Sequence, residues 1–181
     1  MFRTIVGTVA VLAGLGVLEK SVDASTGLAG SCKATQAYAM LHPGESLPVR
    51  ATPTPHGTVV GALATRNLAA EMTPSVVTLI GSQSGWARIA LVGADFSAVD
   101  GDKRQTGWIP ADMLTVDTRV DGPITLHTRP GLMGQEIGKI EGQDARFRVL
   151  GCRGDWLQVI NAQQGNVWID RWCAKEEGCR G

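Results

Sequence analysis

An internal repeat constrains the fold of this chain more than any other feature. Three segments of the first half reappear in the same order in the second half. They are residues 47–63 with 124–140 at a shift of 77, residues 77–89 with 147–159 at a shift of 70, and residues 106–114 with 166–174 at a shift of 60. Each drop in shift is a difference in loop length, which surface loops tolerate well. The sequence therefore predicts two copies of one small unit.

Each copy is patterned as a set of short strands. The alternating apolar residues of the second copy are Ile124 with Leu126, Phe147 with Val149, and Leu157 with Val159. This period of two is typical of strands with one buried face, and glycine or proline interrupts it every few residues. No segment after residue 24 sustains a helical period for three turns. We expect an all-β protein with two tandem small barrels, one over residues 45–117 and one over residues 122–181.

The first 24 residues have the pattern of a signal peptide. Arg3 precedes an apolar run over residues 4–18, and small residues at Val22 and Ala24 favour cleavage after Ala24. The run is shorter than the roughly 20 residues of a spanning helix, so an uncleaved anchor is the less favoured alternative. We expect a periplasmic or secreted protein without a stable membrane span, with residues 25–44 as an N-terminal extension.

Charge and cysteine content bear on the possible partners, disulfides and metal sites. Seventeen Lys and Arg balance seventeen Asp and Glu, which gives no indication of a nucleic-acid partner. Four cysteines in an exported chain predict disulfides, and three connectivities are possible. They are Cys32, Cys152, Cys173 and Cys179. Their spacing lacks the paired knuckles of a zinc site, so we expect neither a metal nor another cofactor.

The tripeptide Arg153-Gly154-Asp155 has the letters of an adhesion motif. In the repeat, GCRGDW aligns with GSQSGW, which connects two adjacent strands. Glycine tolerates positive φ and aspartate can bond its own backbone, so both suit a tight turn. We interpret the tripeptide as a turn, with adhesion as the alternative.

Catalysis is not indicated. The histidines are His42, His56 and His127, and the repeat places His127 on a strand, facing solvent, at the position of Arg50. A cysteine hydrolase would need a free thiol beside a histidine, and GSQSG has Gln83 where a nucleophile elbow needs serine. We expect a protein that is not an enzyme.

The ordered elements resemble a known family. The first copy carries LPVRATP, VVGAL, VTLIG, SGW and TGWIPADML, and the second carries ITLHTRP, EIGKI, RFRVLG, GDW and VWIDRWC. This set resembles the bacterial SH3-like (SH3b) domain over residues 45–174. Two features depart from the pattern: the first copy has an inserted hairpin loop over residues 92–106, and the second has Asn166-Val167 where glycine normally precedes tryptophan.

The resemblance implies a site and a function. In the family, aromatic residues line a shallow groove for extended peptides, which points to Trp86, Trp108, Trp156, Trp168 and Trp172; the alternative is that these rings fill small cores. The family implies peptidoglycan stem peptides or envelope proteins as partners of a non-enzymatic cell-envelope protein. A structural scaffold for envelope proteins and an accessory to a separate cell-wall hydrolase are the alternatives.

The resemblance also implies a pairing of the cysteines. In SH3-like barrels the end of the strand carrying Cys152 approaches the turn carrying Cys173, so we expect a Cys152–Cys173 bridge and a Cys32–Cys179 bridge. The competing arrangement pairs Cys173 with Cys179 and leaves Cys32 with Cys152.

Overall fold

The fold is all-β, as predicted. The computed structural model describes residues 30–42, 44–65, 74–141, 146–161 and 163–174. Within these ranges the chain forms strands and one 3-10 turn, η1 (Ala111–Met113), with no α-helix. The predicted signal peptide over residues 1–24 and Cys179 lie outside the described residues.

The strands follow the alternation seen in the sequence. Those of the first half are β1 (Gly30–Ala39), β2 (Ser46–Arg50), β3 (Val59–Ala64), β4 (Ser75–Gln83), β5 (Trp86–Ala90), β6 (Phe96–Ala98) and β7 (Thr106–Pro110). Those that follow are β8 (Leu114–Asp117), β9 (Ile124–His127), β10 (Glu136–Ile140), β11 (Arg146–Arg153), β12 (Trp156–Asn161) and β13 (Gly165–Ile169).

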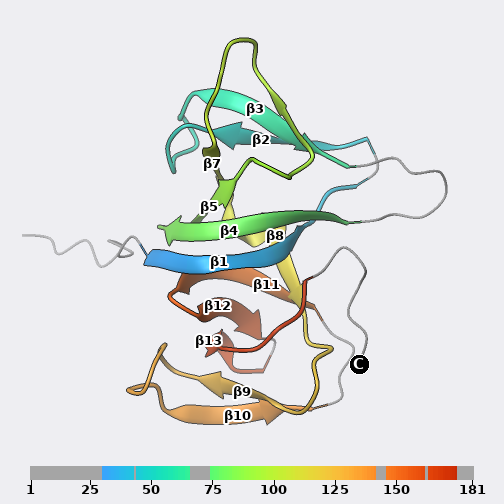
Figure 1. Ribbon diagram of the computed structural model, residues 1–181. Coiled ribbons are helices and arrows are strands. Elements are labelled where there is room, and N and C mark those ends of the chain that lie inside the picture. Colours follow the sequence, from blue (N-terminus) through green and yellow to red (C-terminus); the bar gives the residue numbers. More distant parts are fainter. Residues whose placement is uncertain (1–29, 43, 66–73, 142–145, 162, 175–181) are drawn as a thin grey trace, which may run out of the picture.

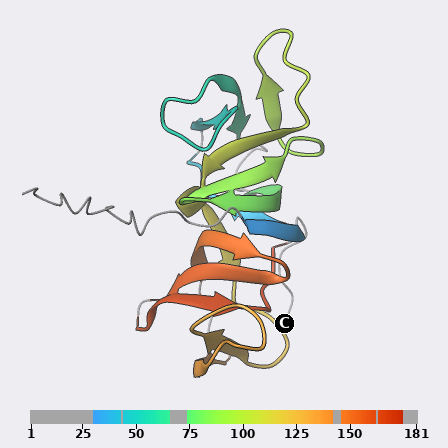
Figure 2. The same cartoon turned by 90° about the vertical axis from the view of Figure 1, so that its left-hand side faces the viewer.

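All strands belong to one antiparallel sheet with two ends (Figure 1). Its order is β10-β9-β13-β12-β11-β8-β1-β4-β5-β7-β2-β3-β6. The strands β2 to β7 form an upper unit and β9 to β13 a lower unit, with β1 and β8 between them (Figures 1 and 2).

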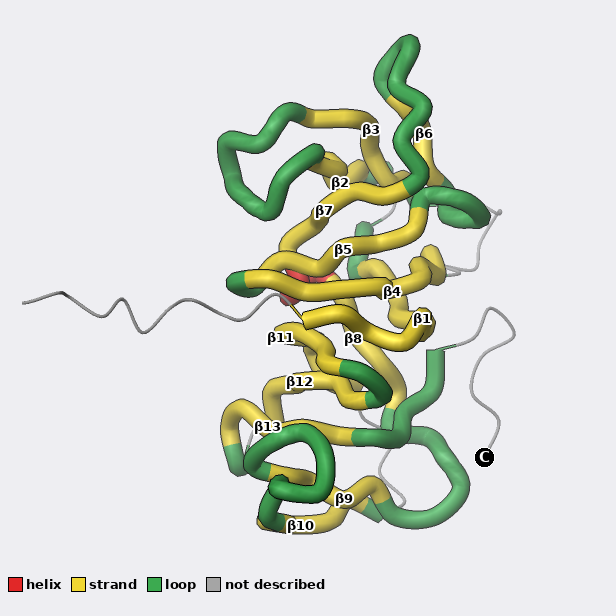
Figure 3. Tube along the Cα trace, turned by 60° about the vertical axis from the view of Figure 1, so that its left-hand side comes forward, coloured by secondary structure: helices red, strands yellow, loops and turns green. Residues whose placement is uncertain are grey.

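The strand pairing of the first half recurs in the second half. In the first unit β2 pairs with β3, β4 with β5, and β7 with both β5 and β2. In the second unit β9 pairs with β10, β11 with β12, and β13 with both β12 and β9. Even the register shift after Leu79 in β4 recurs after Val149 in β11. The predicted inserted loop of the first unit contains β6, which pairs with β3, and Figure 3 shows this segment extending from the unit.

The N-terminal extension contributes the strand that joins the two units. β1 pairs with β4 of the first unit and with β8, and β8 pairs in turn with β11 of the second unit. The Asp117 carboxylate, 2% exposed at the end of β8, accepts hydrogen bonds from Arg119 (3.1 Å) and Arg146 (3.4 Å). The two units are thus parts of one continuous sheet.

The core is almost entirely aliphatic. Its largest fully buried side chains are all leucine, isoleucine or valine, including Leu63, Leu79, Ile109, Leu157 and Ile169. Burial of such side chains from water is the main driving force for folding. Within the described residues, no helix has the length and hydropathy required to cross a membrane.

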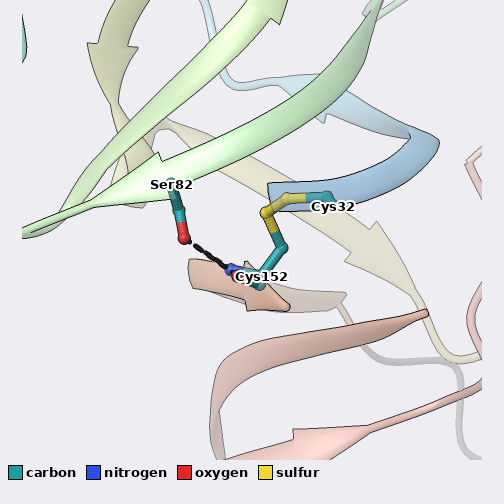
Figure 4. Close-up of a disulfide and its surroundings, with 3 residues drawn as sticks. All are labelled: Cys32, Ser82 and Cys152. Carbon is teal, nitrogen blue, oxygen red and sulfur yellow. Dashed lines mark hydrogen bonds between the residues drawn. A yellow bond between two sulfur atoms is a disulfide. The ribbon is translucent and has the colours of Figure 1, made fainter. Parts of the chain in front are cut away.

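A disulfide between Cys32 and Cys152 ties β1 to β11 (Figure 4). The Cα atoms are 5.6 Å apart, within the usual range for a disulfide. Cys173 is also disulfide-bonded. The predicted Cys152–Cys173 and Cys32–Cys179 bridges are therefore wrong, and the competing Cys32–Cys152 pairing is confirmed. The prediction failed because it relied on the resemblance of the repeated units to SH3-like barrels, and the strand that brings Cys32 to Cys152 lies outside the repeat.

Ser82 of the first unit reinforces this junction. Its hydroxyl accepts a hydrogen bond from the Cys152 amide (2.9 Å) and donates one to the Cys152 carbonyl (3.1 Å) (Figure 4). Both backbone groups of one buried residue are thereby satisfied by a side chain from the other repeat, which removes the cost of leaving them unpaired.

Candidate ligand-binding surfaces

The five tryptophans lie at the surface and outside the core. All five are half-buried. In β5 the neighbours of Trp86 alternate with it, so Ala87 and Ile89 face the core and Trp86 faces outward. Trp108 in β7 has buried neighbours on both sides and likewise faces outward. Part of each indole ring is therefore exposed to solvent and can contact other molecules.

The outer face of β5, β7 and β2 carries a row of three large side chains. Trp108 is paired across the sheet with Arg88 of β5 on one side and with Arg50 of β2 on the other. Directly paired residues of antiparallel strands place their side chains on the same face. Trp86 is paired with Pro110, two residues along β5 and β7 from the Arg88–Trp108 pair and on the same face. We call these five residues the first Trp surface.

The two arginines of the first Trp surface are held by hydrogen bonds to uncharged groups. Arg50 donates from Nη1 to the Gly57 carbonyl (2.8 Å), and Arg88 donates from Nη2 to the Thr106 hydroxyl (3.2 Å). Within the described ranges, neither guanidinium forms an ion pair with a carboxylate. Two positive charges, with no carboxylate partner among the residues that the structure describes, therefore flank one indole ring.

The second unit has the corresponding arrangement. Trp168 of β13 is paired with Gln158 of β12 and with His127 of β9. The His127 and Trp156 rings meet edge to face, with centroids 4.9 Å apart and an interplanar angle of 88°. We call these four residues the second Trp surface. An edge-to-face contact of this kind is favourable and fixes the orientation of both rings.

His127 differs from its prediction. It was expected to face solvent, but its ring is half-buried and packs on Trp156. Its Nδ1 atom is buried and has no hydrogen-bond partner among the described residues. The strand position was correct, and the contact with Trp156 was missed because it depends on the register in which β13 joins β9 and β12.

The two surfaces match position by position in the repeat. Trp86 and Trp156 correspond, as do Trp108 and Trp168. The flanking positions differ, because the first surface has Arg50 and Arg88 where the second has His127 and Gln158. The aromatic pair is therefore common to both units, and the arginines on both sides of Trp108 are specific to the first; in the second unit an arginine, Arg153, is instead paired with Trp156. Sequence reasoning identified the tryptophans and missed the two arginines as part of a site.

Trp172 has a separate, structural environment. It packs against the core, and its indole N–H donates a hydrogen bond to the Gln36 carbonyl of β1 (3.3 Å). The adjacent Cys173 exchanges two backbone hydrogen bonds with Asp117 of β8. These contacts attach the segment after β13 to the strands that join the units, so we place Trp172 outside both Trp surfaces.

The Arg153-Gly154-Asp155 tripeptide forms the turn between β11 and β12, as predicted. Gly154 has a φ of 58°, which glycine adopts without strain. Its carbonyl accepts from the Lys33 amide (2.9 Å), and its amide donates to the Ser31 carbonyl (2.8 Å). Asp155 forms an ion pair with Lys33 at 3.2 Å. The turn is thus fastened to β1 by main-chain and charged contacts.

The second unit also contains a cavity of about 460 Å³. Its lining includes the apolar side chains of Leu126, Ile140 and Phe147, and the positively charged side chains of Lys139, Arg146 and Arg148. Lys139 is paired with Glu136, and Arg146 is paired with Asp117. No sequence pattern indicated this cavity, because its lining comes from several strands that are not consecutive in the chain.

The two remaining histidines lie at the surface. His42 and His56 are exposed, and the His42 amide donates to the Glu45 carboxylate (2.9 Å). In the described part of the chain, no group of three or more His, Cys, Asp or Glu residues is arranged to hold a metal ion.

Comparison with known proteins gives only distant structural likenesses. No protein-family model matches the chain, and no curated protein matches it. NlpC2 from Trichomonas vaginalis is similar over 82% of this chain and 51% of its own, with a TM-score of 0.33 and 16% identity. NlpC1 from the same organism is similar over 77% of this chain and 49% of its own, with a TM-score of 0.30 and 15% identity. The chain spans about half the length of each. Likenesses at these values do not define a family.

Proposed function

We propose that this is a non-enzymatic cell-envelope protein that binds peptide-like ligands, such as peptidoglycan stem peptides, on its Trp surfaces. The two units are two SH3-like barrels within one continuous sheet. The repeated strand pairing supports this description, because each unit joins its strands in the same order and pairs β2 with β7 or β9 with β13.

The position of the tryptophans carries the proposal. A small unit could use its tryptophans to fill its core. Here leucine, isoleucine and valine fill the core, and the indoles lie on the outside. Half-exposed aromatic rings beside polar groups are typical of surfaces that bind extended peptides. Because the arrangement occurs in both units, we expect two sites for related ligands.

The continuous sheet affects how two sites act together. β1, β8 and the Cys32–Cys152 disulfide hold the units in one arrangement. Two sites held at a fixed spacing increase avidity for a polymer whose binding groups match that spacing. Peptidoglycan is a polymer of this kind, because stem peptides recur along each strand. The fixed spacing of the two sites is therefore a further reason to favour it as the ligand.

A disulfide is consistent with export to an oxidising compartment. We therefore propose a periplasmic or secreted location, with the predicted signal peptide directing export.

Sedimentation with purified peptidoglycan tests the proposal. The purified protein is mixed with insoluble peptidoglycan, and the bound fraction is compared with that of Trp108→Ala and Trp168→Ala. Val92→Ala, at an exposed apolar position outside the Trp surfaces, is the matched control. We expect each Trp substitution to lower retention and the control to leave it unchanged. Retention that is absent, or unaffected by both Trp substitutions, contradicts wall binding at these surfaces.

A scaffold that binds envelope proteins is the second candidate, and one observation favours it. The loop between β9 and β10 exposes Leu132 and Met133, which are 105% and 85% exposed. The corresponding loop of the first unit carries Pro55 and His56 at these positions. If Leu132→Ser with Met133→Ser abolishes an interaction with envelope proteins that Trp108→Ala leaves intact, the scaffold is supported.

A further inference from the structure

We infer that the first Trp surface recognises free carboxylate groups of its peptide ligand, through Arg50 and Arg88 on either side of Trp108. This inference deepens the proposed function, because it assumes peptide binding and adds the chemical group that is read. It also assigns different specificities to the two units.

The geometry provides the first argument. Arg88, Trp108 and Arg50 stand at paired positions on three adjacent strands, so their side chains share the outer face in a single row. Directly paired residues have Cβ atoms about 5 Å apart. A peptide that lies on the indole is therefore within reach of a guanidinium group on each side.

The charges provide the second argument. Neither Arg50 nor Arg88 forms an ion pair among the described residues. The carboxylates there that form ion pairs do so with other lysines and arginines. The planar guanidinium presents several N–H donors, and one hydrogen bond to a neutral oxygen leaves the others unused. Carboxylates match these donors in geometry and charge.

The choice of occupant follows from the combination of groups. Trp86 and Trp108, with Pro110, provide apolar contact area that an extended peptide covers and that inorganic phosphate or a phosphate polymer does not. A peptide with a terminal or side-chain carboxylate satisfies both the indoles and the arginines.

The second unit acts as an internal comparison. At the positions of Arg50 and Arg88 it has His127, packed on Trp156, and Gln158. The second Trp surface therefore has the same aromatic pair without an arginine on either side of Trp168; Arg153 is paired with Trp156 and not with Trp168. We expect it to bind peptide without a preference for free carboxylates.

The test compares two forms of one synthetic four-residue stem peptide, one with its carboxylates free and one with every carboxylate amidated. Binding is measured by calorimetry with the wild-type protein, Arg88→Gln, Arg50→Gln and Arg148→Gln. Arg148 is the matched control, since it is exposed, lies in the second unit and has no ion pair within the described residues. Circular dichroism melts confirm folding, and Arg88→Lys tests whether charge alone is sufficient.

We expect the free-carboxylate peptide to bind about 3- to 10-fold more tightly than the amide, because the contact is a charge-assisted hydrogen bond at a partly exposed site. Arg88→Gln and Arg50→Gln should remove this preference, and Arg148→Gln should retain it. Equal binding of the two peptides overturns carboxylate recognition and leaves peptide binding intact. Loss of the preference in Arg148→Gln, or displacement of the peptide by millimolar inorganic phosphate, also overturns the assignment. No binding of either peptide contradicts the proposed function itself.

Discussion

Removal of the Cys32–Cys152 disulfide should lower the free energy of unfolding and also change its dependence on urea. The bridge joins residues separated by 120 positions, so it closes most of the chain into one loop. In the chain-entropy treatment, a loop of this length restricts the denatured state by about 4.9 kcal/mol at 25 °C. Compact denatured states reduce this value, so we expect a loss of about 2–5 kcal/mol.

The perturbation is Cys32→Ala with Cys152→Ala, because a reductant would also break the disulfide of Cys173. Urea unfolding followed by tryptophan fluorescence gives the free energy and its dependence on urea. We expect a lower free energy of unfolding together with a larger slope, since an unlinked denatured chain exposes more surface.

Ser82→Ala provides the comparison for this prediction. It removes two hydrogen bonds at the same junction without altering the covalent link, so it should cost about 1–3 kcal/mol with an unchanged slope. If the double cysteine variant unfolds with the stability and the slope of the wild type, the disulfide does not restrain the denatured chain and the reasoning is refuted.

Three further predictions concern the core, an ion-pair network and a tightly packed glycine. Leu157→Ala, at a side chain with 0% exposure, should cost about 2–5 kcal/mol, while Ile160→Ala on the same strand, 46% exposed, should cost under about 0.5 kcal/mol; equal losses in urea unfolding would contradict the assigned core. Asp117→Asn should cost about 1–2 kcal/mol at low salt and less at high salt, because both arginine partners are partly exposed; a loss independent of salt would contradict an ionic role. Gly107→Ala should lower the melting temperature, since its Cβ would lie 2.2 Å from Val49 Cγ1; an unchanged melt would contradict this packing.

The repeated part of the fold could be predicted from the sequence because its information is local. Alternation of apolar residues marks strands such as β11 and β12, and the same order of motifs in both halves predicts two matching units. The hairpin of β12 and β13 forms although Val167 replaces the glycine of the first copy. Val167 is fully buried there, so the second unit accommodates the larger side chain.

The strand β1 could not be predicted in the same way. Its sequence, GSCKATQAYA, has a weak apolar pattern, and only Ala37, Tyr38 and Ala39 are buried. Strand formation there depends on partners from both units, which is a tertiary effect and not a local one. The wrong disulfide prediction has the same origin, because β1 carries Cys32 to the end of β11.

The candidate site was predicted in part. Trp86, Trp108, Trp156 and Trp168 were identified, and alternation with buried neighbours such as Ala87 and Ile89 already indicates that Trp86 faces outward. The arginines beside Trp108 required the register of three strands that are far apart in sequence, which no local pattern supplies.

Intrinsic tryptophan fluorescence during titration with soluble peptidoglycan fragments tests the central claim most directly. The account predicts a saturable change in the wild-type protein that is reduced in folded Trp108→Ala and Trp168→Ala variants and lost when both substitutions are combined. No change across fragments with and without stem peptides, or a change that the combined variant retains in full, would contradict peptide binding on the Trp surfaces.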